Sequence, residues 1–181
     1  MAISTTNRPY KYGSGDRREF IVKDSEVSYI AVNDSYGNPV ICGRAKIGTS
    51  LNDSKWQIEK VSYDATQGVT RVTWAEDDGK ATGDYIFKWG TVSELEITGI
   101  SQAATAVVTV SDIGDLAEGD KILILDVEGM EDVNFDGEDF LTVDNIAGNT
   151  FELTGVNSTA FDAYTSGGKI IYGDLLNLTF S

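Results

Sequence analysis

The chain of 181 residues contains no histidine, a single cysteine and only two prolines. Without histidine there is no Ser-His or Cys-His nucleophile pair, no imidazole general base, and none of the usual zinc sites. The lone Cys42 excludes an internal disulfide framework, and its neighbours Ile41 and Gly43 favour a buried, unreactive thiol on a strand. These absences remove the commonest enzyme classes, so we expect a protein without catalytic activity.

The chain also lacks long apolar runs, and its second half has few basic residues. No run approaches the roughly 18 residues of a membrane span, and the first residues carry no apolar signal core, so we expect neither a membrane segment nor a secretory leader. Residues 1–93 hold 12 Lys/Arg against 12 Asp/Glu, whereas residues 94–181 hold 2 against 17, which accounts for the whole net charge of −15. Such an acidic surface repels phosphate backbones, so nucleic acid is not an expected partner.

What the sequence does contain is a series of short β-rich runs separated by turn clusters, without helical periodicity. In the first half these runs lie at residues 20–22, 27–32, 40–47, 56–63, 69–74 and 85–89. In the second half they lie at residues 95–98, 106–110, 121–126, 140–144, 150–154, 169–172 and 175–180. The pattern predicts an all-β protein with an extended N-terminal arm (1–16), an antiparallel β-domain (17–93) and an acidic small β-barrel (94–181).

The stretch from residue 119 to 146 is central to the prediction. Residues 121–125 are a continuous apolar run typical of a strand buried on both faces, and residues 140–143 are a second strand, so together they predict a hairpin. The connection between them carries Asp132, Asn134 and Asp136 followed by Gly137, which fits the first six positions of a helix-loop-helix calcium loop.

Other features of this connection depart from the calcium template. Position 12 should be glutamate and is Val143, and the flanks are predicted strands where the template requires helices. A solvated acidic turn is therefore the favoured interpretation. A partial ion site formed by Asp132, Asn134, Asp136 and Glu138 is the alternative, and no other cofactor is expected.

The second half also carries a spaced pattern of turn and apolar residues that covers about residues 95–172. The pattern consists of Ile97, Gly99, Ile100, Leu116, Gly119, Asp120, Val127, Gly129, Met130, Asn134, Phe151, Leu153, Phe161, Tyr164, Gly167, Gly168, Lys169 and Ile170. It resembles the small β-barrel of ubiquitin-activating enzymes, their first catalytic-cysteine half-domain. That barrel is an accessory module without the reactive cysteine, and residues 94–181 contain no cysteine. The resemblance therefore implies a barrel fold without ubiquitin chemistry.

The same barrel resembles components of tailed-phage virions. In the first half, Ile41, Gly43, Ala45 and Gly48, followed by a Trp56-x-Ile58 pattern, are similar to short phage proteins. Together the two resemblances imply a structural protein located in the virion, either a capsid decoration (cement) protein or a tail-associated adaptor or fibre component. They imply other virion proteins as partners and a homo-oligomer, with a trimer as one option.

The first half is the expected attachment surface, because an arm without a core of its own gains order by lying on a neighbour. We expect Tyr10, Tyr12, Arg17 and Arg18 to contact the partner, although Arg17-Arg18 can equally be an ordinary charged strand start.

Two other functions stay open from the residues alone. One is a carbohydrate-binding module that stacks sugars on Trp56, Trp74 or Trp89. The other is a glycoside hydrolase that uses two carboxylates from Asp126, Glu128, Asp132 and Asp136.

Overall fold

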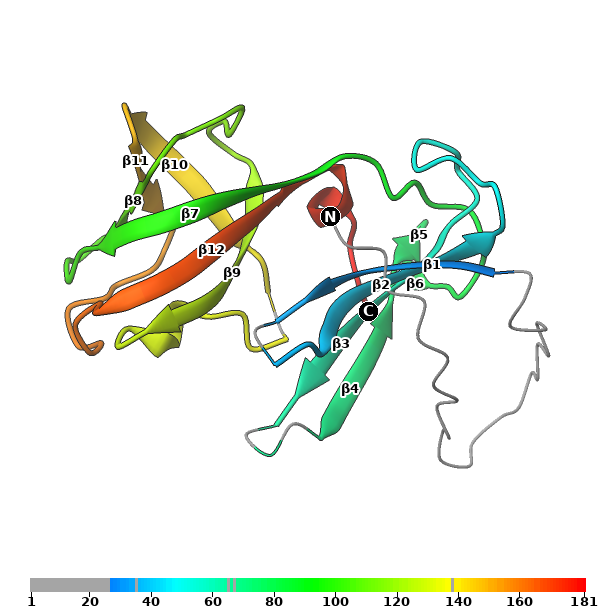
Figure 1. The fold of residues 1–181 in the computed structure, drawn as a ribbon, viewed down its shortest axis with the longest axis horizontal. Coiled ribbons are helices and arrows are strands. Elements are labelled where there is room, and N and C mark those ends of the chain that lie inside the picture. The colour runs from blue at the N-terminus through cyan, green and yellow to red at the C-terminus, as the bar shows by residue number, and fades with distance from the viewer. Residues whose placement is uncertain (1–26, 35, 65, 67, 138) are drawn as a thin grey trace.

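The computed structural model is all-β, as the sequence predicts, and describes residues 27–34, 36–64, 66, 68–137 and 139–181 (Figure 1). Its first part is a four-stranded antiparallel sheet in the order β1-β2-β3-β4. The strands are β1 (Val27–Asn33), β2 (Pro39–Lys46), β3 (Gln57–Tyr63) and β4 (Val69–Trp74). A short hairpin follows, in which β5 (Glu76–Asp77) and β6 (Lys80–Ala81) have two residues each. No helix in the described residues is long and apolar enough to cross a membrane.

The second part is a closed six-stranded barrel in the order β10-β11-β8-β7-β12-β9. Its strands are β7 (Val92–Ile100), β8 (Val107–Val110), β9 (Lys121–Glu128), β10 (Leu141–Ala147), β11 (Thr150–Leu153) and β12 (Ser166–Gly173). Closure gives every strand two neighbours, so the barrel presents no free edge for pairing with another chain. The barrel predicted for the second half is therefore confirmed.

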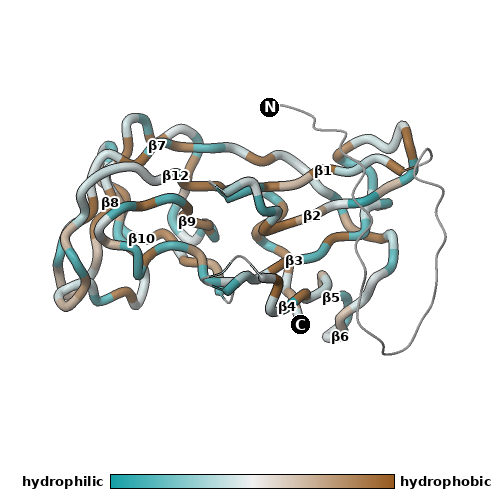
Figure 2. Tube along the Cα trace, turned by 60° about the horizontal axis from the view of Figure 1, so that its bottom comes forward, coloured by the Kyte–Doolittle hydropathy of each residue, from teal (hydrophilic) through white to brown (hydrophobic). Residues whose placement is uncertain are grey.

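Strand β9 is the wall that the barrel shares with the sheet. Ile122 and Ile124 point into the barrel core, whereas Leu123 and Leu125 belong to a second core that also contains Ile41, Trp56 and Trp89 of the first half. The continuous apolar run is explained by this position, because both faces of the strand are removed from water. Figure 2 shows the barrel and the sheet lying side by side along the long axis of the molecule.

The predicted hairpin between residues 121 and 143 forms, but its pairing is short. β9 and β10 are antiparallel over two residue pairs, Leu141 with Ile122 and Thr142 with Lys121. β9 pairs more extensively with β12, over six residue pairs. The connection of residues 129–140 runs back along β9 between these two pairings: the Phe135 N–H donates to the Ile124 carbonyl, and Met130 and Val133 are buried in the barrel core.

One predicted strand, residues 85–89, is wrong. Only Phe87 is paired, through an isolated bridge to Trp56. Gly90 then adopts a φ of 71° and donates its N–H to the Leu51 carbonyl, which turns the chain away. Side chains alternate between buried and exposed from Ile86 to Trp89 as they would in a strand, but among the described residues no second strand pairs with them beyond the Trp56 bridge.

The predicted last strand, residues 175–180, is also wrong over most of its length. Asp174–Asn177 forms a 3₁₀ helix, and only Phe180 is bridged, to Ala75. Leu175 and Leu176 are both buried in the core between sheet and barrel, and neighbouring residues of a strand cannot share a face. A helical turn brings both leucines to that core.

Candidate functional site

The acidic connection of residues 129–140 was the candidate ion site, and the structure uses its Asn134 for another purpose. The Asn134 Oδ1 accepts a hydrogen bond from the Val127 N–H at 2.9 Å, and its Nδ2 donates to the Val127 carbonyl at 2.9 Å. The next residue, Phe135, donates its N–H to the Ile124 carbonyl at 2.7 Å. The side chain of Asn134 thus holds the connection against β9 and is not directed toward an ion.

The carboxylates of this connection are spread over its surface. Asp132, Asp136 and Asp139 are exposed and line a hollow of about 260 Å³ whose floor includes Ile124 and Leu141. In the described residues no group of three or more His, Cys, Asp or Glu side chains is placed to hold a metal ion. Glu138, the fourth candidate ligand, lies outside the described residues. The flanks of the connection are strands, as the sequence predicts.

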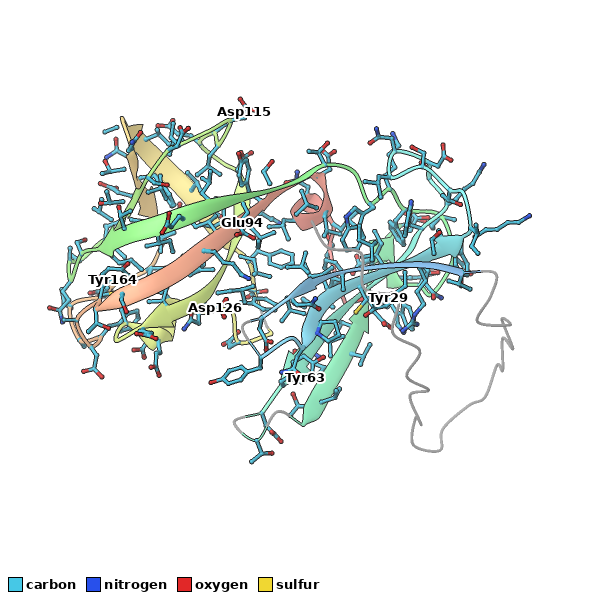
Figure 3. The ribbon with its side chains drawn as sticks, in the orientation of Figure 1. Tyr29, Tyr63, Glu94, Asp115, Asp126 and Tyr164 are labelled. Atoms are coloured by element: carbon cyan, nitrogen blue, oxygen red, sulfur yellow. The ribbon has the colours of Figure 1, made fainter. Side chains whose placement is uncertain are left out.

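The other two carboxylates considered for glycoside hydrolysis pair with residues of β12. Asp126 lies 3.4 Å from the Lys169 ammonium, and Glu128 accepts a hydrogen bond of 2.6 Å from the Ser166 hydroxyl. Asp126 adopts a φ of 64°, a left-handed conformation within β9. Both carboxylates have a structural contact across the β9–β12 pair, and Figure 3 shows Asp126 on the barrel side that faces the sheet.

The acidic connection meets the four-stranded sheet at Lys60. The Lys60 ammonium lies 5.5–5.7 Å from the ring centres of Phe135, Phe140 and Phe180, and the residue is buried. A cation over aromatic faces is attracted by the negative charge of the ring centres. Nearby, the Ser62 hydroxyl donates to the Gly137 carbonyl at 3.0 Å. We call this set of contacts the joint; it fixes the connection to β3.

The opposite face of the sheet carries a buried polar group. Arg44 and Glu59 form an ion pair at 2.7 Å, and burial raises the pKa of Glu59 while the neighbouring Arg44 lowers it. Cys42 is buried beside them and accepts a hydrogen bond from the Tyr29 hydroxyl at 3.2 Å. Burial raises the pKa of Cys42 to about 12, so its thiol stays protonated and unreactive at neutral pH, as the sequence predicts.

The tryptophans lie mainly in the core. Trp56 is 2% exposed and Trp89 is 0% exposed, and their rings contact each other with centres 6.1 Å apart. Neither can stack on a sugar without unfolding the sheet, and Trp74 is half-buried on β4. The carbohydrate-binding alternative therefore loses two of its three candidate residues.

Exposed large hydrophobic side chains are unevenly divided between the two halves of the described chain. The described residues contain seven: Tyr29, Tyr36, Ile47, Leu51, Val69, Tyr85 and Ile86. All seven belong to the first half, and none to the described residues of the barrel. Four of them come from two segments at one end of the sheet, the β2–β3 loop and the segment before Phe87. Figure 2 shows hydrophobic segments in these loops, at the end of the sheet far from the barrel.

None of these exposed residues was predicted from the sequence to contact a partner. Ile47 and Leu51 stand on either side of a Gly48-Thr-Ser turn, where an apolar residue has no strand to join, and that was the available signal. The selected contact residues Tyr10, Tyr12, Arg17 and Arg18 lie outside the described residues.

No family model matches the chain, and no curated protein matches it.

Proposed function

We propose that the chain is a non-enzymatic structural component of a tailed bacteriophage virion, either a capsid decoration protein or a tail-associated adaptor or fibre component. Its partners are other virion proteins and further copies of itself. The virion location is supported by the resemblance of residues 95–172 to a barrel of such particles and by the phage-like pattern from Ile41 to Ile58.

The observation that carries a contact role is the division of the surface between the two parts. The described residues of the barrel expose no large hydrophobic side chain, and residues 94–181 carry 17 Asp/Glu against 2 Lys/Arg. The first half exposes all seven large hydrophobics of the described residues. Because exposed apolar groups mark contact surfaces and dense charge favours solvent, the sheet attaches to the particle and the barrel projects outward.

Particle composition tests this proposal. Purified particles should contain the chain in many copies, and the chain should sediment with them through a density gradient. Its absence from particles made in cells that express it would overturn the proposal, as would turnover of a glycoside by the purified chain.

A further inference from the structure

The four-stranded sheet has one face that is turned away from the barrel, and we name it the outer face. Cys42 pairs with Glu59 across β2 and β3, and Glu59 pairs with Trp74 across β3 and β4, so these three side chains share one face. Val61, two residues along β3 from Glu59, lies on it as well. Ile58 alternates with them and belongs to the core between sheet and barrel, which places the other four on the outer face.

The centre of the outer face is buried, but by neither of the two cores. Cys42 is 2% exposed, Glu59 3% and Val61 6%, and neither core of the described residues contains Cys42 or Val61. Gly83 covers one end of the face, where its carbonyl accepts a hydrogen bond from the Gln57 side chain. A side chain on an open sheet face stands toward solvent, so the burial of the centre indicates a further layer over it.

Glu59 requires a polar group in that layer. One of its carboxylate oxygens, Oε1, accepts a hydrogen bond of 2.7 Å from Arg44. The other, Oε2, is buried and has no hydrogen-bond partner among the described residues. A buried carboxylate oxygen without a donor destabilises the fold, so the layer should bring an N–H group to it.

The segment before β1 is placed to supply the layer. Outside the described residues the chain has only residues 1–26 and four single positions, so a layer made by the chain itself comes from residues 1–26. This segment joins β1 at Val27, and Tyr29 of β1 reaches the outer face, where its hydroxyl donates to the Cys42 Sγ at 3.2 Å (Figure 3). Ten extended residues span roughly 33 Å, which exceeds the length of the seven-residue β1.

The composition of this segment fits the outer face. Residues 20–22 are the apolar run Phe-Ile-Val, which suits the buried Cys42 and Val61. Arg17 and Arg18 precede the run, and a guanidinium carries five N–H donors that match a carboxylate. Because the segment is attached beside the face, its effective concentration there exceeds that of the same segment on a second copy.

We propose that residues 17–26 fold back over the outer face of their own chain. The apolar run of residues 20–22 lies on Cys42 and Val61, and Arg17 or Arg18 donates to the Glu59 Oε2. In this arrangement the two arginines serve the chain's own sheet, and residues 1–16 are the arm that remains for a partner. The inference does not depend on the virion location.

The thiol of Cys42, the single cysteine of the chain, shows whether the outer face is covered. Its reaction with Ellman's reagent at neutral pH should be slow in wild type. A chain with both Phe20→Asp and Ile21→Asp should react about tenfold faster or more, because charged groups leave an apolar contact and the face opens locally. Ile3→Asp, which places the same charge in residues 1–16, is the matched control and should react like wild type. An unchanged rate in the double variant would overturn the inference.

A variant that fails to fold would also react faster, so disulfide trapping provides the second measurement. Phe20→Cys, Ile21→Cys and Val22→Cys each add one thiol, and diamide serves as the oxidant. At least one of them should form a bridge to Cys42 within one chain, seen as a monomer without free thiols, whereas Ile3→Cys should keep both thiols. Covalent dimers would show that a second copy supplies the segment, and free thiols in all three variants would show that residues 20–22 do not reach the outer face. Either result would overturn the inference and leave the virion function untouched.

Discussion

Lys60 shows how a charged side chain is accommodated inside this molecule. It extends from β3 into a space bounded by Phe135, Phe140 and Phe180, which come from the acidic connection and from the end of the chain. The rings of Phe135 and Phe140 are stacked with centres 5.7 Å apart, and Phe180 meets Phe140 edge-on. The aliphatic stem of the lysine packs in the interior while its charge is held by the ring faces.

Shortening Lys60 should therefore destabilise the fold. Lys60→Ala removes both the cation–ring contacts and the packed stem, so we expect the free energy of unfolding to fall by about 2–3 kcal/mol. Urea unfolding followed by tryptophan fluorescence measures the change. Lys80→Ala, at an exposed lysine of β6, is the control and should change stability by less than about 0.5 kcal/mol. Equal stability of the two variants would show that the joint contributes nothing.

Two carboxyl groups on β3 and the turn after it should respond to pH with opposite sign. Burial raises the pKa of Glu59 in the folded chain, so folding favours its protonated form and wild type gains stability relative to Glu59→Gln as pH falls from 7 toward 4.5. Hydrogen bonds from Thr66 and Gly68 lower the pKa of Asp64, so its contribution is present at neutral pH and is lost as pH falls through the acid range.

Urea midpoints of wild type, Glu59→Gln and Asp64→Asn at a series of pH values between 7 and 3 test these signs. The difference between wild type and Glu59→Gln should move in favour of wild type on acidification, and the Asp64→Asn difference should move the other way. The same direction in both variants would contradict the assigned environments.

The acidic connection of residues 129–140 is the element whose role differs most from its sequence pattern. It matches the beginning of a calcium loop, yet Asn134 binds the backbone of β9 and Gly137 contacts Ser62 of β3. Gly137 has a φ of 95°, and a Cβ at this position would collide with the Ser62 side chain. Glycine is thus required here both for the backbone conformation and for the close approach.

Replacing this glycine should loosen the joint. Gly137→Ala should lower the free energy of unfolding by about 3 kcal/mol, because the strained φ and the collision with Ser62 act together. Gly148→Ala provides the comparison, since Gly148 also has a positive φ, 62°, but nothing lies within 4 Å of an added Cβ. It should lose only about 1 kcal/mol. Thermal or urea unfolding of both variants would show equal losses if Ser62 did not contact Gly137.

A strong local pattern predicted β9 correctly but did not by itself ensure a strand elsewhere. Residues 121–125 predicted a strand buried on both faces, and β9 has this burial because it separates two cores. Residues 85–89 and 175–180 also alternate, but a strand needs a partner, and alternation within one segment does not reveal whether a neighbour is present.

The joint could not be predicted from the sequence. Ser62 and Gly137 are 75 residues apart, and the lysine and its three rings come from three separate segments. The acidic run was visible as a pattern, but only the fold shows that Asn134 is used on β9. Likewise, the exposure of Ile47 and Ile86 depends on what packs beside them, which local sequence does not contain.

At the scale of the whole molecule, the sheet and the barrel are joined by the second core, which contains residues of both. Leu123 and Leu125 of β9 and Ile171 of β12 pack with residues of the sheet, so separating the two parts would expose them. Surface properties, in contrast, divide cleanly between the two parts. The charge asymmetry seen in the sequence coincides with the asymmetry of exposed hydrophobics: the acidic excess lies in residues 94–181, and the large exposed apolar side chains of the described residues lie in the first half.

The shared core predicts that the molecule unfolds in one step. The tryptophans lie in the first half, so their fluorescence follows the sheet, while calorimetry follows the whole chain. We expect coincident midpoints and a calorimetric to van't Hoff enthalpy ratio of about 1. Two separate transitions would show that the barrel and the sheet are independent units.

An averaged image of a particle that carries this chain tests the central claim most directly. The account predicts density for the chain with the loops around Ile47 and Ile86 against the particle and the acidic barrel directed toward solvent. Density with the barrel seated on the particle and those loops free in solvent would contradict it.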